Sequence, residues 1–274
     1  MRLNLWWDSV HRLVFRQTGR GEVSPLPWLR LHGEAGHATY RESGPADVDI
    51  DSITGEAGAL AYLPGPLEIE GAAGGSWFDG ARDAPHYSGA LRYRGIDRVV
   101  LEGGAAGGPV ETPLGVREGI RQDAQSAAAF FGLTPEDQVT LSYRHAFYSD
   151  ANNRDTVRWE YGHRFVEKPD LRLGYAGTYD DTRKDATEYY SPEDLHLHRA
   201  TARMSYSPWE PLTLDGRLSL GYGWEDGRGR VVGDASGEAS WRFTKSLELS
   251  AWISHFRNPR YWATTTGLNL VIRF

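Results

Sequence analysis

Hydrophobic and polar residues alternate with period two through most of the second half of the chain. From 139 to 148 the odd positions are Val, Leu, Tyr, His and Phe, and the even positions are Thr, Ser, Arg, Ala and Tyr. Similar alternation recurs in the segments 157–165, 171–179, 212–224, 247–254 and 268–274. Because successive side chains of a strand point to opposite faces, this pattern predicts strands with one apolar and one polar face.

Turn sequences separate these segments. Short ones are Asn152-Asn153, Lys168-Pro169-Asp170, Pro208 to Pro211, Thr244-Lys245 and Asn258-Pro259. Longer polar stretches run from Asp180 to Pro192 and from Glu225 to Gly233. The mixture of short and long connections predicts an up-and-down meander, with tight turns at one end and loops at the other.

The first half shows a weaker version of the same pattern. Alternation around Leu29 to Glu34, Leu67 to Glu70 and Tyr87 to Arg94 predicts further strands, whereas the first 26 residues are uncertain. Gly103 to Gly108 is rich in glycine and alanine and is expected to be a connection. The segment Gly119 to Phe131 fits a short helix or a strand, and its neighbours favour the strand.

A soluble β-sandwich also alternates, but three features favour a membrane barrel. The segments are longer than ordinary strands and suit a tilted membrane crossing. There are about fourteen apolar faces, more than a two-sheet core of this length can bury. Aromatic residues gather at segment ends, as interfacial girdles require: Tyr222, Trp224, Trp241, Phe243, Tyr261 and Trp262.

We therefore expect an all-β fold: a transmembrane, antiparallel, up-and-down outer-membrane β-barrel that occupies residues 1–274 as one domain. The sequence shows about 15 strands, and an even number is required in a single-chain bacterial barrel. The prediction is 16 strands, with 14 as the alternative.

Composition narrows the class of protein further. The chain has 32 glycines and 33 aromatic residues (10 Trp, 14 Tyr and 9 Phe), which favours strands over helices. It contains no cysteine, so disulfides and thiolate metal sites are excluded. The net charge of -7 argues against a nucleic-acid partner. No apolar signal-peptide core is visible in the first 20 residues.

If the apolar face meets lipid, the polar face lines the lumen. A charged side chain that faces lipid near the bilayer centre costs roughly 2–4 kcal/mol, so the charged residues of these strands are expected to point inward. The candidate lumen and polymer-contacting residues are Arg144, Tyr148, Arg158, Glu160, Arg164, Arg172, Arg199, Arg203, Arg217, Arg242, Glu248, Trp252 and Arg273. These charges serve either polymer contact or simply the stability of the interior.

The long connection from Asp180 to Asp194 is acidic. Its carboxylates are Asp180, Asp181, Asp185, Glu188, Glu193 and Asp194. An acidic exit would favour a cationic polymer. A solvated loop that binds divalent ions between lipopolysaccharides explains the same residues equally well.

Two short motifs carry a resemblance to a known family. The segment Phe147 to Arg154 (FYSDANNR) resembles the F-S-D-G-N-x-R hairpin of exopolysaccharide export porins. Downstream, Tyr189 to Asp194 (YYSPED) is similar to the Y-[YF]-S-P element of the same barrels. The family includes the poly-N-acetylglucosamine export porin and the barrel of the cellulose-secretion subunit. The resemblance covers about residues 110–274 and departs from the pattern at Ala151, where glycine is usual.

This resemblance implies a porin-like conduit that exports a polysaccharide across the bacterial outer membrane. It implies as partners the secreted polysaccharide, lipid and lipopolysaccharide, a periplasmic tetratricopeptide-repeat scaffold and an inner-membrane glycan synthase complex. The repeat scaffold would have to lie outside this chain, because no 34-residue helical repeat is visible. The terminal Phe274, which follows an alternating strand, looks like the signal read by the barrel-assembly machinery.

An outer-membrane enzyme of the acyl hydrolase type and a closed structural or adhesive barrel are the alternatives. A hydrolase would need serine and histidine close together. His145, His163 and His255 fall on the apolar face, Ser191 lies beside a proline, and no G-x-S-x-G motif occurs. His196 and His198 share one face but are too few to hold a metal. We expect no catalytic residue, no cofactor and no metal.

Overall fold

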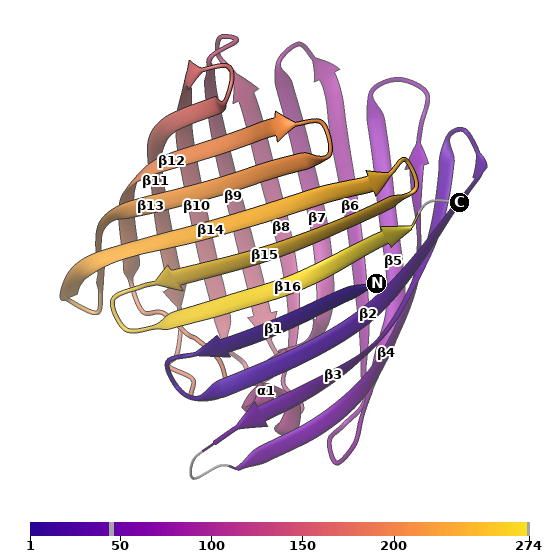
Figure 1. Ribbon diagram of the computed structural model, residues 1–274. Helices are drawn as coiled ribbons and strands as arrows, with labels where there is room; N and C mark the ends of the chain where they lie inside the picture. Colours follow the sequence, from indigo (N-terminus) through magenta and orange to yellow (C-terminus); the bar gives the residue numbers. More distant parts are fainter. Residues whose placement is uncertain (44–46, 273–274) are drawn as a thin grey trace.

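Sixteen antiparallel strands close into a barrel in the computed structural model, which describes residues 1–43 and 47–272 (Figure 1). Each strand pairs with the strands before and after it in the chain, and β1 pairs with β16 to close the sheet. The prediction of a 16-strand up-and-down barrel is confirmed. Closure leaves no unpaired sheet edge.

The strands are as long as the alternating sequence segments indicated. They are β1 (Arg2–Asp8), β2 (Arg12–Leu26), β3 (Leu29–Glu42), β4 (Val48–Tyr62), β5 (Leu67–Phe78), β6 (Ala84–Ile96), β7 (Val99–Pro109), β8 (Arg121–Gly132), β9 (Asp137–Tyr148), β10 (Asn153–Val166), β11 (Asp170–Thr182), β12 (Leu195–Trp209), β13 (Leu212–Glu225), β14 (Arg228–Thr244), β15 (Leu247–Arg257) and β16 (Trp262–Ile272). A single helical turn, α1 (Pro113–Arg117), lies between β7 and β8. Within the described residues, no helix is long and apolar enough to cross a membrane.

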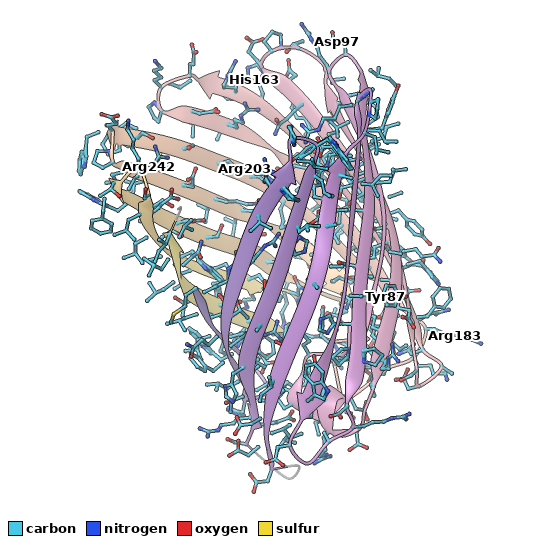
Figure 2. All side chains as sticks on the ribbon, turned by 90° about the vertical axis from the view of Figure 1, so that its right-hand side faces the viewer. Tyr87, Asp97, His163, Arg183, Arg203 and Arg242 are labelled. Carbon is cyan, nitrogen blue, oxygen red and sulfur yellow. The ribbon has the colours of Figure 1, made fainter. Side chains whose placement is uncertain are left out.

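The two ends of the barrel differ. At one end, here called the turn end, short connections such as 97–98 and 210–211 join the strands, and β1 begins and β16 ends there. At the opposite end, the loop end, lie α1 and the connection 183–194. Figure 2 shows Asp97 and Arg183 at these opposite ends.

The alternation separates the two faces as the sequence predicts. Leu220 and Ile53 point outward and are 62% and 63% exposed, whereas Ala38 and Ala146 on the inner face are fully buried. Outer-face aromatic residues such as Trp77, Trp241 and Phe243 lie near strand ends and are exposed. The outer face is therefore apolar without any partner from the same chain, as lipid contact requires.

Two expected connections are strands. Within 225–233 the connection is only two residues long, because β13 ends at Glu225 and β14 begins at Arg228. The two turn residues, Asp226 and Gly227, both have positive φ (47° and 69°). An Asp-Gly pair with this geometry makes the tight hairpin turn that suits twisted strands. Gly103 to Gly108 belongs to β7, where small residues are held by backbone pairing to β6 and β8. The strand expected within 119–131 is confirmed as β8.

Two further expectations need correction. Tyr261 is not a girdle residue: it is 8% exposed and donates a hydrogen bond to Asp8 Oδ2 at 2.8 Å. The helix α1 was not expected at all. Thr112 caps it by accepting a hydrogen bond from Gly115 N at 3.1 Å, and Pro113 occupies its first turn. Both features belong to the loop end, where the chain turns into the lumen.

Candidate functional site: the lumen wall and its loop plug

The predicted lumen residues lie on the inner face. Two neighbouring cavities, of about 730 Å³ and 540 Å³, share Arg217, Ser236 and Ser254 and form one groove along the inner wall from β9 to β15. Seven of the candidates line it: Arg158, Glu160, Arg172, Arg199, Arg203, Arg217 and Trp252. By the same alternation Arg144, Tyr148, Arg164, Arg242 and Glu248 also face inward, and Arg273 and Phe274 lie outside the described residues.

Carboxylates on two strands hold three of the guanidinium groups of the groove in place. Glu160 accepts from Arg203 at 2.7 Å and from Arg217 at 3.3 Å. Asp234 accepts from Arg199 at 2.5 Å. These pairs join β10 to β12 and β13, and β12 to β14, so they reach over the strands between and keep the guanidinium planes oriented.

Arg154 is fixed more firmly, under the loop end. Its Nε and Nη2 atoms donate to the two oxygens of Asp180 at 2.7 and 2.5 Å, a bidentate geometry. Asp180 was expected in the acidic loop, but it lies in β11 and is 3% exposed. Asp181 also belongs to β11, which continues to Thr182, so the connection itself begins at 183.

The connection 183–194 folds into the lumen and is latched to the β9–β10 turn. Asn152, which is 4% exposed, donates to Lys184 O at 2.8 Å and to Tyr189 Oη at 2.9 Å, and its Oδ1 accepts from Lys184 N at 3.0 Å. The ring of Tyr189 stacks on Tyr148 with a centroid distance of 4.4 Å. Tyr148, predicted to contact polymer, is therefore covered by this loop.

The same loop reaches across the lumen. Thr187 O accepts a hydrogen bond from Arg12 of β2, a strand seven places from β11 in one direction and nine in the other. Glu188 O accepts from Thr112 Oγ1 at 2.5 Å, which joins this loop to the α1 loop. Tyr190 stacks on Tyr261 with a centroid distance of 4.7 Å. We call the segments 110–120 and 183–194 together the loop plug.

Helix α1 packs on an apolar patch of the opposite inner wall. Val116 is 1% exposed and packs in one cluster with inner-face residues of β2 to β6: Val14, Ala38, Tyr40, Val48, Ile50, Phe78 and Ala84. A patch of this kind inside a polar lumen is stable only when another apolar surface covers it. The apolar composition of this part of the wall is therefore matched to the presence of the plug.

The sequence did not lead us to predict that Asn152, Tyr189 and Tyr190 hold the plug in place. One signal was present: apolar residues such as Val14, Val48 and Ile50 stand at inward positions near the loop end. An apolar residue on the lumen side of a barrel indicates that something inside covers it.

The histidines and Ser191 make hydrogen bonds and aromatic contacts of the kind that stabilise a fold. On the outer face, His145 bonds Asp155 at 2.7 Å and His163 bonds Asp137 at 2.9 Å. His196 and His198 flank Trp224 on the same outer face, each with a ring centroid 5.3 Å away. Ser191 donates to Asp185 and accepts from Ala186 N within the loop. None of these contacts pairs a serine with a histidine.

Comparison with known proteins identifies the fold. No protein-family model and no curated protein matches the chain. Among solved structures, a bacterial polysaccharide outer membrane secretin has a TM-score of 0.79 and 15% identity, over 100% of this chain and 98% of the other. OccK5 (OpdH) of Pseudomonas aeruginosa has a TM-score of 0.52 and 10% identity, over 100% of this chain and 96% of the other. CdiB from Acinetobacter baumannii has a TM-score of 0.55 and 10% identity, over 98% of this chain and 59% of the other. The chain has the fold of outer-membrane β-barrels.

Proposed function

We propose that this barrel lies in the bacterial outer membrane and conducts a secreted polysaccharide through its lumen. The groove on the inner wall carries the proposal. It is lined by guanidinium, carboxylate and hydroxyl groups together with Trp252 and with Tyr190 of the loop plug. Such a surface offers hydrogen bonds to sugar hydroxyls and aromatic faces to sugar rings.

Conduction requires many weak contacts and no single strong site, since the polymer must keep moving. The groove meets that requirement because its polar groups are spread over strands β9 to β15. The similarity in fold to a polysaccharide outer membrane secretin, over nearly the full length of both chains, supports the same proposal. So do the two family-like motifs, at 147–154 and 189–194, which together build the latch between Asn152 and Tyr189.

The loop plug suggests how such a conduit stays closed when no polymer is present. It crosses the lumen at the loop end, and its latches are hydrogen bonds and aromatic stacks between loops. The partners in this proposal are the polysaccharide, lipopolysaccharide, the barrel-assembly machinery, a periplasmic tetratricopeptide-repeat scaffold and an inner-membrane glycan synthase.

The test is secretion in the native bacterium. Deletion of the gene should remove the polysaccharide from the cell surface, and the wild-type gene should restore it. Trp252→Ala removes the lumen indole and should reduce secretion, whereas Trp77→Ala, which removes an exposed outer-face indole, is the matched control. Heat-modifiable gel migration verifies that both variants assemble. Unchanged surface polysaccharide after deletion, with no second copy of the gene, would refute the conduit.

A further inference from the structure

The middle of the groove carries more cations than anions. Around Glu160, Asp180 and Asp234 stand six arginines, which we call the arginine cluster: Arg144, Arg154, Arg158, Arg199, Arg203 and Arg217. Glu225 also lies close enough for its charge to act on Asp180 and Arg154, so six guanidiniums stand against four carboxylates, a local excess of two positive charges. The whole chain, by contrast, has a net charge of -7.

Three of these carboxylates are already engaged. Asp180 binds Arg154, and Glu160 and Asp234 bind the cluster members of β12 and β13. In the part of the chain that the structure describes, Arg144 and Arg158 make no ion pair. Four charged groups act most strongly on Arg158. One is Asp180, which is already paired with Arg154, and the other three are arginines. Arg144 reaches only an uncharged amide, that of Gln122, 2.9 Å from its Nη2 atom.

These two arginines are neighbours and face open space. Arg144 of β9 is paired with Thr156 of β10, two positions from Arg158 on the same face. Both side chains are exposed to the lumen. Arg158 lines the 730 Å³ cavity of the groove, whereas Arg144 lines a separate cavity of about 300 Å³. That second cavity also has the carboxylates of Glu34, Glu56 and Glu111, of which Glu56 pairs with His86 and Glu111 with Arg16. Volumes of this size are those of ordinary small-ligand sites.

The guanidinium groups also have spare donors. The Nε atoms of Arg199, Arg203 and Arg217 are buried without a hydrogen-bond partner among the described residues. A guanidinium presents its donors as a planar fork that matches the two oxygens of a carboxylate, sulfate or phosphate group. Because these Nε atoms are covered, an anion that enters the lumen first meets the exposed forks of Arg144 and Arg158, to which no carboxylate of the described wall is paired.

We propose that the arginine cluster binds anionic groups of the conducted polymer, so that the substrate class is an acidic polysaccharide with carboxylate, sulfate or phosphate groups. This inference rests on the proposed conduit function. Of the six carboxylates expected in the acidic connection, Asp180 pairs with Arg154, and the other five are not among the residues that line the groove. Near the turn end, Asp215 and Glu238 face each other across β13 and β14, which confines the positive excess to the cluster.

Calorimetry on the refolded full chain in detergent tests the proposal without requiring an open pore. The probes are four hexasaccharides: galacturonate (carboxylate), a heparin fragment (sulfate), neutral maltohexaose and cationic glucosamine. The variant is Arg144→Gln with Arg158→Gln. The matched control is Arg20→Gln with Arg30→Gln, which removes two lumen charges near the turn end. Among the described residues, their only ion pairs are contacts of 3.8 and 3.7 Å with Glu22.

We expect hexagalacturonate, the heparin fragment or both to bind more tightly than maltohexaose at low ionic strength. Loss of Arg144 and Arg158 should weaken that binding by about fivefold or more, while the control variant changes it by less than about twofold. The two acidic probes then distinguish carboxylate from sulfate recognition. Equal binding of maltohexaose, preference for the glucosamine oligomer, or equal losses in both variants would overturn the anionic class. A conducting barrel that secretes a polysaccharide and still fails this test would leave the conduit standing and reject only the anionic substrate.

Discussion

The latch at Asn152 offers a sharp test of the loop plug. Asn152→Ala removes three hydrogen bonds that hold the connection 183–194 against the β9–β10 turn: two to the backbone of Lys184 and one to Tyr189 Oη. The side chain is 4% exposed, so the surrounding groups have little water to replace it. The strands themselves are untouched, because 152 lies in the turn before β10.

The expected magnitude follows from these contacts. A typical hydrogen bond contributes about 0.5–1.5 kcal/mol net, and three of them about 1.5–3 kcal/mol once some rehydration of the freed groups is allowed. Since about 1.4 kcal/mol corresponds to a factor of ten, the ratio of open to closed loop should rise about 10- to 150-fold. Tyr189→Phe, which keeps the stack on Tyr148 and removes only the hydroxyl, should give a smaller rise.

Single-channel recording in planar bilayers measures the change as open probability. Asn4→Ala is the matched control, because Asn4 lines an inner-wall cavity and its Oδ1 is buried with no hydrogen-bond partner among the described residues. It should leave the open probability unchanged. If Asn152→Ala opened no more often than wild type or Asn4→Ala, although its barrel is assembled, the loop would not be held by this latch and the plug would need another explanation.

Three more outcomes are expected. Leu220→Arg should impair membrane insertion by roughly 2–4 kcal/mol if 220 lies near the bilayer centre. Ser236 points inward and is exposed, so Ser236→Arg should be tolerated. Refolding into vesicles measures both variants, and equal yields would contradict the assigned faces. Glu160→Gln frees two arginines, so it should lower stability by about 1 kcal/mol in chemical unfolding and raise the chloride-over-potassium permeability ratio. Burial raises the pKa of Tyr190 and of Tyr261 above its usual value of 10.0. The neutral phenols therefore stabilise the closed plug below about pH 10, and this stabilisation is lost as the pH rises further; the open probability should stay flat up to about pH 10 and increase above it.

The sequence alone determined the wall of this barrel. Alternation is a local property of a strand, so the outward position of Leu220 and the inward position of Arg158 could be assigned without knowing which strands are neighbours. The strand number followed from counting such segments and from the even number that closure requires. The 226–227 turn was missed although its Asp-Gly pair is a local signal.

Only the tertiary structure decided how the interior is filled and which charges pair. Glu160 takes its partners from positions 43 and 57 residues away, because the barrel register lets the arginines of β12 and β13 reach it over β11, where its neighbour is Ala176. The plug depends on Val116 meeting an inner patch that includes Val14 and Ile50, which lie far before it in the chain. A single strand shows only that such a residue is apolar and points inward. Whether a loop covers it is a property of the closed barrel, because the covering surface exists only after the distant strands have assembled into one wall.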